Sequence, residues 1–189
     1  MQDPLILRDA STGDLAGVAN LLEQAYAEHE RRFPPAVWAT YRRELAAVGD
    51  RLAVSELIVG MRGGELVGTV TFYPQAAADG HDWPPGVASL RLLAVRPGAR
   101  GAGVGAALVA ACIRRARAQG AAHLGLHTAS FMEAANRLYA RLGFVRAPHL
   151  DFDADVRYGG APVGPGTGRL AGAAYLLPLE PGRAGRDAR

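Results

Sequence analysis

The sequence predicts an α/β fold in a single domain, with a central mixed β-sheet and helices on both of its faces. The chain has 189 residues and is 49% hydrophobic, which is enough for one core. Apolar residues alternate on both sides of Gly63 and Gly64, which predicts a β-hairpin. After the hairpin, apolar strands alternate with amphipathic helices, as in βαβ units. We expect one domain over residues 1–179 and a flexible polar tail at 180–189.

The spacing of apolar residues defines the elements of the first half. A short strand is expected at 5–11. Helical spacing then predicts a helix at about 14–29 and a second one from about 37 to 48, separated by the helix-breaking segment "RRFPP". Alternating apolar residues predict the hairpin at 55–73. Because residues 74–86 are rich in Pro, Gly and Asp, we expect a loop there.

The second half alternates strands and helices. A mostly apolar strand is expected at 87–95, of the kind that is buried inside a sheet. A helix follows at about 103–118 and ends at Gly120, as helices often do. The remaining elements are expected to be a strand at 123–128, a helix at 131–143, a strand at 144–147, a long loop at 151–168 and a last strand at 169–179.

The composition excludes several classes of function. All 21 basic residues are arginines, so a Walker A lysine and a pyridoxal Schiff base are both ruled out. The arginines are scattered and the net charge is +3, so we expect no nucleic-acid partner. No apolar run approaches the length of a membrane helix, and the start of the chain lacks a basic signal-peptide region. With Cys112 as the only cysteine, these features predict a cytoplasmic protein without a membrane partner.

The segment "RPGARGAGVGAAL" at residues 96–108 carries the strongest functional pattern. Residues 101–106 satisfy the G-x-G-x-x-A pattern of dinucleotide-binding folds. That pattern needs an acidic residue at the end of the next strand, and the first acid after that strand is Glu133, on a helix. A plain packing turn is a second interpretation. A third is an anion site, because glycine-turn amides and a helix N-terminus together attract phosphate.

Two motifs at the right separation favour the third interpretation. The spacing Arg100-x-x-Gly103-x-Gly105 resembles the R/Q-x-x-G-x-G/A signature of the GNAT N-acetyltransferase superfamily, whose loop holds the pyrophosphate of coenzyme A. Farther along, Tyr139 and the Gly143-Phe144 pair resemble the Y-x-x-x-G-F ending of the family's fourth helix. The chain is therefore identified as a member of this superfamily, which implies that the fourth and fifth strands splay apart.

The resemblance implies acetyl-CoA as co-substrate and no metal. The pantetheine arm is expected along the strand formed by Leu93, Ala94 and Val95, and Asn136 is expected to contact the cofactor. Around the pyrophosphate, the resemblance implies Arg100, Gly101, Ala102, Gly103, Val104, Gly105 and Ala106. Asp151, Asp153 and Asp155 alternate in the loop at 151–168, but they do not form a full set of calcium ligands.

The resemblance also assigns catalytic roles. Tyr139 is implied as the general acid that protonates the departing thiolate, and the backbone of Leu93 as the oxyanion donor. Many relatives carry a glutamate that deprotonates the amine where this chain has Ser89. Ser89 can hold a water molecule but cannot be the base. The remaining candidates for the base are Glu28, His29, Glu30, His81, Asp82 and His127, or water alone.

These observations predict an N-acetyltransferase that moves an acetyl group to a primary amine by direct attack in a ternary complex. The acceptor, a small molecule or a peptide, is not readable from the sequence, and neither is the choice between acetyl and longer acyl donors. Dimers are frequent in the family, so a homodimer is one expected state. The alternative is a catalytically silent module of the same fold that senses acetyl-CoA.

Overall fold

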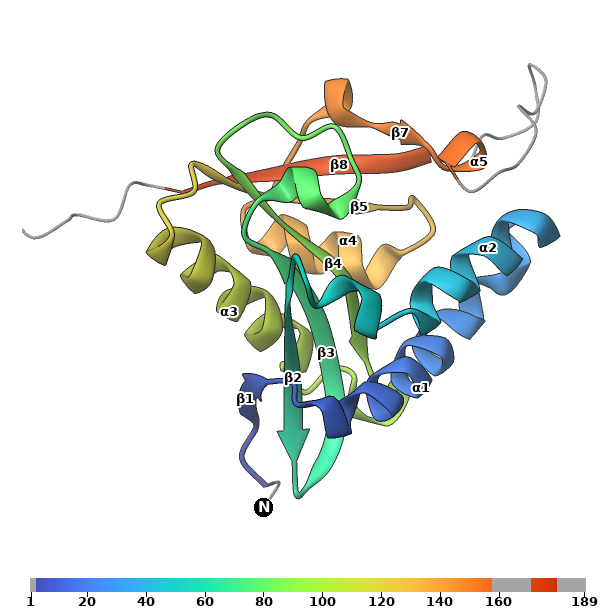
Figure 1. Ribbon diagram of the computed structural model, residues 1–189, viewed down its shortest axis with the longest axis vertical. Helices are drawn as coiled ribbons and strands as arrows, with labels where there is room; N and C mark the ends of the chain where they lie inside the picture. Colours follow the sequence, from blue (N-terminus) through green and yellow to red (C-terminus); the bar gives the residue numbers. More distant parts are fainter. Residues whose placement is uncertain (1–2, 158–170, 180–189) are drawn as a thin grey trace, which may run out of the picture.

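The computed structural model describes residues 3–157 and 171–179, and Figure 1 shows how the elements are arranged. The helices are α1 (Leu15–Tyr26), α2 (Pro35–Ala46), α3 (Val104–Ala118), α4 (Glu133–Arg141) and the single turn α5 (Ala154–Arg157). The strands are β1 (Ile6–Asp9), β2 (Glu56–Arg62), β3 (Glu65–Tyr73), β4 (Val87–Val95), β5 (His123–Thr128), β6 (Val145–Arg146), β7 (Phe152–Asp153) and β8 (Ala171–Pro178).

The strands form one mixed sheet in the order β1-β2-β3-β4-β5-β8-β6, and β7 pairs with β8. The β4–β5 pair is parallel, and the other pairs are antiparallel. Gly63 and Gly64 both adopt positive φ at the β2–β3 turn, as a two-residue hairpin requires. The mixed sheet and the hairpin that the sequence predicts are therefore confirmed.

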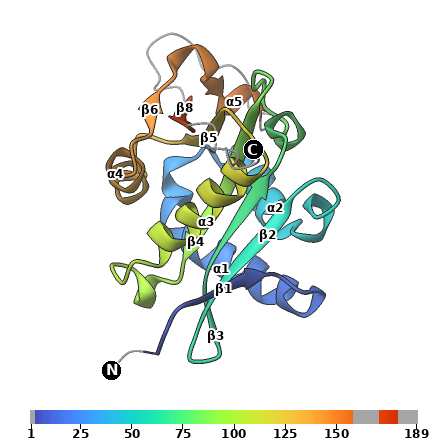
Figure 2. The ribbon, with the colours of Figure 1, turned by 90° about the vertical axis from the view of Figure 1, so that its left-hand side faces the viewer.

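Helices cover both faces of the sheet, as the sequence predicts (Figures 1 and 2). On one face, Leu108 and Cys112 of α3 pack with the buried side chains of the sheet, among them Leu124. On the other face, Leu22 of α1 and Leu45 of α2 belong to a second buried cluster. Burying a side chain of this size stabilises the fold by about 1.5–3 kcal/mol, so the two clusters fix the helices against the sheet.

The first turn of α3 lies unusually close to strand β3. A Cβ atom added at Gly68 would lie 2.7 Å from Cγ1 of Val104 and 2.9 Å from Cδ1 of Leu108. Only a glycine permits this approach, because both atoms belong to a helix that is packed into the core. The glycine at position 68 therefore sets where the N-terminus of α3 lies relative to the sheet.

The C-terminal part of the described chain differs from the sequence prediction. Residues 151–168 were expected to form a loop, and this expectation is wrong for Phe152–Arg157, which form β7 and α5. The reason is a tertiary contact: Phe152 of β7 pairs with Gly172 of β8. The predicted tail at 180–189 lies outside the described residues. Within the part that is described, no helix has both the length and the apolar character needed to span a membrane.

Candidate functional site

A gap opens in the middle of the sheet, where two parallel strands separate. The β4–β5 pairing runs from Val87–His123 to Ser89–Gly125 and no farther. Both strands continue past that point, β4 as far as Val95. Within the described residues, the edge of β4 that faces β5 therefore has no strand partner over its second half. This is the splay that the sequence resemblance implies.

A β-bulge lies at the gap. Thr69 pairs with Ala94 and Thr71 pairs with Arg91, so β4 has one more residue than β3 between these pairs. Leu92, in the bulge, has a φ of 55° and is the one non-glycine residue with positive φ in the described chain. This conformation costs about 1–2 kcal/mol for an L-residue. Because Leu92 is buried in the α1–α2 core, packing holds it there.

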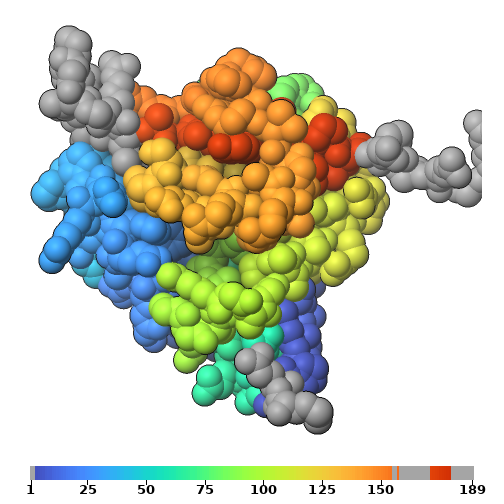
Figure 3. Space-filling view, turned by 180° about the vertical axis from the view of Figure 1, so that it is seen from behind, coloured from blue at the N-terminus to red at the C-terminus, as the bar shows by residue number. Residues whose placement is uncertain are grey.

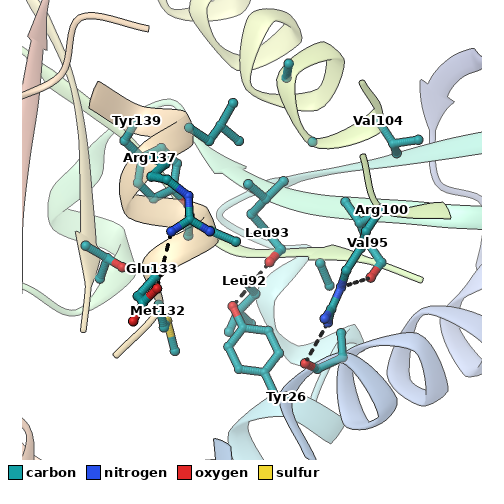
Figure 4. A pocket seen from close by; sticks show the side chains of 18 of the residues that line it. Tyr26, Leu92, Leu93, Val95, Arg100, Val104, Met132, Glu133, Arg137 and Tyr139 are labelled. Atoms are coloured by element: carbon teal, nitrogen blue, oxygen red, sulfur yellow. Dashed lines mark hydrogen bonds and ion pairs between the residues drawn. The ribbon is translucent and has the colours of Figure 1, made fainter. Parts of the chain in front are cut away.

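The gap is part of a cavity of about 690 Å³, which falls in the range of small-molecule binding sites. Figure 3 shows the hollow from outside, between the yellow-green segment that follows β4 and the amber α4. In Figure 4, side chains from α1, β4, α3 and α4 converge on it. Of the residues predicted for the site, ten line this cavity: Leu93, Ala94, Val95, Arg100, Gly101, Gly103, Val104, Gly105, Ala106 and Tyr139.

Three other predicted residues do not line this cavity. The Asn136 amide nitrogen donates to the carbonyl of Ala129 at 3.0 Å, so it holds the turn after β5. The carbonyl of Ala102 accepts a hydrogen bond from Arg62 at 3.4 Å. Ser89 is fully buried, and its hydroxyl donates to the Asp79 carboxylate at 2.5 Å. Asn136 and Ser89 therefore bind protein groups in the arrangement seen here.

The N-terminus of α3 forms one end of the cavity. Gly103, at the N-cap, has a φ of 78° and provides no side chain to bind the first amides. The first turn contains no acidic residue, and residues 104–106 line the cavity. Uncapped amides and the helix dipole together give this end a partial positive charge. It is suited to an anion such as a phosphate group.

Arg100 lies at the same end of the cavity and is held by α1 and the segment after it. Its guanidinium lies 2.8 Å from the carboxylate of Glu28 and 3.4 Å from the carbonyl of Ala25. A third bond joins it to the carbonyl of Val95 (Figure 4). The hydrogen bond from Arg100 lowers the pKa of Glu28. Both side chains are partly exposed, so the ion pair itself adds little stability.

Tyr139 lies at the other end of the cavity, on α4. The residue is 5% exposed, and its ring packs edge-on against Phe144 with centroids 5.6 Å apart. Burial raises the pKa of Tyr139 well above its ordinary value, so the hydroxyl keeps its proton at neutral pH. In the described part of the chain the hydroxyl has no hydrogen-bond partner. It is therefore free to donate to a group bound in the cavity.

Tyr26 is a site residue that the sequence reasoning missed. It ends α1, and its hydroxyl donates to the carbonyl of Leu93 at 3.4 Å, within the β4 bulge (Figure 4). It also lines both this cavity and the one described next. Nothing in the sequence distinguishes it from a packing residue, because it follows directly on the apolar stripe of its helix.

A second, smaller cavity adjoins the first. Its volume is about 90 Å³, and aromatic side chains form much of its wall, among them Phe33, Tyr41 and Phe152. The two cavities share six residues: Tyr26, Arg91, Leu92, His127, Thr128 and Met132. A small group placed in the second cavity is therefore next to the gap between β4 and β5.

The structure separates the candidates for the catalytic base. Glu28, His29 and His127 line the first cavity, and His81 and His127 line the second. Asp82 and Glu30 line neither cavity. His127 is thus the one candidate that belongs to both walls.

Asp79, which the sequence reasoning did not single out, organises the wall beside the second cavity. The carboxylate accepts hydrogen bonds from Ser89, from the indole of Trp83 at 2.9 Å and from His81 at 2.9 Å. Burial alone would raise the pKa of Asp79, but the bonds from His81 and Ser89 outweigh it and lower the pKa. Asp79 is therefore an ionised carboxylate inside the protein. The Asp-x-His spacing of Asp79 and His81 was the sequence pattern from which this pair could have been predicted.

The described residues contain no cluster of three His, Cys, Asp or Glu side chains that is arranged to hold a metal ion. Cys112, on α3, is buried in the core, and burial raises the pKa of its thiol to about 12. It therefore acts as a small apolar side chain.

Solved structures with this fold were found by comparison. The ribosomal-protein-S18-alanine N-acetyltransferase from Escherichia coli is 21% identical, with a TM-score of 0.62, and the match covers 98% of this chain and 99% of that one. A putative acetyltransferase from Salmonella typhimurium, YncA, solved with its cofactor acetyl-CoA, gives the same four values. The PaiA N-acetyltransferase from Thermoplasma acidophilum, in complex with coenzyme A, is 11% identical, with a TM-score of 0.68, covering 93% and 99%.

These identities establish the fold alone. A search of the curated proteins found no relative that matches the sequence. The sequence pattern of the Acetyltransferase (GNAT) family matches residues 15–144, which include the splayed strands, the glycine loop and Tyr139. The chain therefore belongs to the GNAT family of acetyltransferases.

Proposed function

We propose that this protein transfers an acetyl group from acetyl-CoA to a primary amine, by direct attack of the amine on the thioester. One observation carries the proposal: a single cavity joins the uncapped N-terminus of α3, the unpaired edge of β4 and the buried hydroxyl of Tyr139. An anion site, an extended groove and a proton donor therefore lie along one path. That order matches a molecule with a diphosphate at one end and a thioester at the other.

Coenzyme A fits the residues at the phosphate end. The first-turn amides of α3 and the guanidinium of Arg100 would bind the diphosphate, and the unpaired edge of β4 would bind the amides of the pantetheine arm. Arg137 and Arg141 of α4 also line the cavity and complement further phosphate charge. When bound, the thioester supplies the activated acyl group.

Two groups of this chain would assist the transfer. The backbone N–H of Leu93, in the bulge of β4, would donate to the thioester oxygen as negative charge develops there. The Tyr139 hydroxyl would donate its proton to the departing sulfur. Burial makes Tyr139 a weaker acid than a phenol in water, but the same dry surroundings would make the departing thiolate more basic, which favours the transfer of the proton to the sulfur.

A silent sensor of acetyl-CoA is the second candidate function. Ser89 favours this function, because it stands where many relatives have a glutamate that acts as the general base. The Ser89 hydroxyl binds Asp79, and the residue does not line the main cavity. Such a protein would bind the co-substrate through the same amides and would not turn it over.

Two measurements on the full chain test these functions. The first compares thermal stabilisation by coenzyme A with stabilisation by NAD and NADP, and preference for coenzyme A is expected. The second follows free thiol release from acetyl-CoA with phenethylamine, spermidine, free amino acids and a peptide with a free N-terminus. Thiol release with any of these amines supports the transferase. Stabilisation by coenzyme A without thiol release identifies the sensor, and preference for a nicotinamide cofactor overturns both.

A further inference from the structure

Two imidazole rings lie where the two cavities meet. His127 stands on β5 two residues beyond Gly125, the last β5 residue that pairs with β4, and it lines both cavities. His81 lines the second cavity, and the centroids of the two rings are 4.4 Å apart. The rings of Trp83 and Phe152 pack against His127 with centroids 4.5 and 4.8 Å away.

The hydrogen bonds of His127 decide which nitrogen carries the lone pair. Nε2 lies 2.9 Å from the carbonyl oxygen of Leu150. A carbonyl only accepts, so Nε2 carries the proton and Nδ1 of the neutral ring carries the lone pair. In the described residues, Nδ1 has no hydrogen-bond partner and is not among the buried unpaired atoms. The lone pair of His127 is therefore open to the cavities that the ring lines.

The neighbouring ring is fixed in the same way. Nδ1 of His81 lies 2.9 Å from Oδ1 of Asp79, so it carries the proton and Nε2 carries the lone pair. This Nε2 is buried without a partner, and the side chain is 5% exposed. An unpaired buried acceptor is costly, so a hydrogen-bond donor arriving in the second cavity has a ready partner there. The lone pairs on Nδ1 of His127 and Nε2 of His81 can therefore both accept a hydrogen bond from an N–H group bound where the two cavities meet.

The charges around the pair favour neutral rings that still accept a proton. Burial lowers the pKa of both rings, that of His127 to about 4, so both are neutral at pH 7. The negative charge of Asp79 acts in the opposite sense and stabilises a proton on His127. Three further charged groups face the pair: Arg91 of β4, which binds Glu44, Arg157 of α5, which binds the carbonyl of Gly80, and Asp151, which pairs with Arg146.

The other basic groups in the cavity walls are ion-paired or line the first cavity alone. Glu28 forms its ion pair with Arg100 at the phosphate end, and Glu133 forms one with Arg137 at 3.3 Å. His29 lies 3.7 Å from the Glu28 carboxylate and lines only the first cavity. The described wall of the second cavity contains no carboxylate. His127 alone combines an open lone pair with a place in both walls.

We propose that His127 is the general base of acetyl transfer, taking the proton of the acceptor amine at Nδ1. This inference rests on the proposed function. The amine nitrogen attacks the thioester carbon, the C–N bond forms, and one N–H proton passes to Nδ1 of His127. Return of the oxygen electrons re-forms the C=O bond and breaks the C–S bond, and the sulfur takes the proton of Tyr139. Loss of the proton from His127 to solvent and proton uptake by Tyr139 restore the enzyme.

The first test compares two Gln variants on the same strand. His127→Gln keeps a donor for the Leu150 carbonyl but loses the basic lone pair. His123→Gln makes the same change four residues earlier, outside both cavities. With the panel amine that gives the fastest thiol release, kcat of His127→Gln should fall about 10²- to 10⁴-fold. The Kd for coenzyme A and the KM for acetyl-CoA should stay within about threefold, and His123→Gln should retain wild-type kcat.

Chemical rescue separates a base from a packing residue. In His127→Ala, added imidazole should restore part of the lost kcat, and the rescue should rise with pH in proportion to the neutral fraction of imidazole. A rescue that does not change with pH, or a His127→Gln variant that keeps more than a third of wild-type kcat, would exclude His127 as the general base. Neither result would contradict the proposed transferase function. If the wild-type chain binds coenzyme A and releases no thiol with any panel amine, the proposed function and the base fail together.

Discussion

The two sides of the cleft are constructed differently. The proposed donor side, where coenzyme A would lie, is built around one continuous stretch that offers backbone groups: β4, the glycine loop and the first turn of α3. The proposed acceptor side is the second cavity, whose wall is formed by residues from many elements: α1, α2, the loop after β3, β4, β5, β7 and the start of β8. A backbone site needs small residues in a fixed local order, which a short motif records. A side-chain site needs only that distant segments meet, and no local pattern records this.

The same difference appears in how the two sides are held. On the donor side, the positions of the amides follow from secondary structure and from a few close approaches such as that of α3 to Gly68. On the acceptor side, a buried carboxylate, Asp79, binds three side chains and so fixes His81 and Trp83. The comparison predicts that donor-side variants lose affinity for coenzyme A, whereas variants at the reacting end lose turnover.

The largest expected effect belongs to the proton donor. Tyr139→Phe should lower kcat about 10²- to 10⁴-fold, because a general acid is lost, with little change in the Kd for coenzyme A. Tyr175→Phe is the matched control, since Tyr175 stands on β8 outside both cavities. Steady-state thiol release and calorimetric binding are the measurements. Full activity of Tyr139→Phe would remove its role as the acid.

Gly103→Glu should weaken coenzyme A binding at least about 100-fold, since a carboxylate would face the diphosphate at a helix N-terminus that favours anions. Gly120 is the matched control, because it has a φ of 73° against 78° for Gly103 and follows the other end of α3. Gly120→Glu therefore carries the same backbone strain without facing the cavity. Equal affinity of the two variants for coenzyme A would contradict the anion site.

Acid should destabilise the acceptor side through His127. Its pKa is about 4 in the folded chain and about 6.5 when unfolded, so the unfolded chain binds the proton first as the pH falls. The stability is therefore complete above pH 6.5 and is lost as the pH falls toward 4, by about 3 kcal/mol in all. Urea unfolding at pH 7 and pH 5 measures this loss. His127→Gln should lose less stability over that interval, and an unchanged loss would exclude His127 as its source.

The smallest expected effect concerns the ion pair at the phosphate end. Glu28→Gln removes a negative charge beside the proposed diphosphate site and releases Arg100, so the Kd for coenzyme A should fall by up to about fivefold. The gain should shrink at high salt, because exposed charges are screened. Glu23→Gln, on α1 and paired with Arg42, is the control. A weaker affinity in Glu28→Gln would show that the carboxylate positions Arg100 for binding.

The sequence indicated more of the residues on the proposed donor side than on the proposed acceptor side. Ten of the expected site residues line the main cavity, since glycines and a helix start define backbone positions on their own. Asn136 was expected there because the family resemblance implies an asparagine that contacts the cofactor, and because it shares a helix face with Tyr139. The structure instead uses its amide to satisfy the carbonyls of Ala129 and Ser130, a short-range need that helical spacing does not reveal.

On the acceptor side, the sequence offered six candidate bases without a way to choose among them. The choice of His127 depends on where β5 leaves β4 and on a carbonyl 23 residues away in the chain, that of Leu150. The same limit explains β7, a two-residue strand that exists because Phe152 meets Gly172. Short elements of this kind follow from tertiary contacts and not from periodicity.

The kink at Leu92 has a consequence for protein engineering. Residues 96–108 carry the family signature, yet the backbone that would face the thioester is bent four residues earlier, by an unfavourable torsion angle held in the α1–α2 core. Grafting the glycine segment into another βα unit would therefore transfer phosphate affinity alone. To transfer the acyl-transfer geometry as well, a designer would have to include Leu92 and the α1–α2 core residues that pack around it.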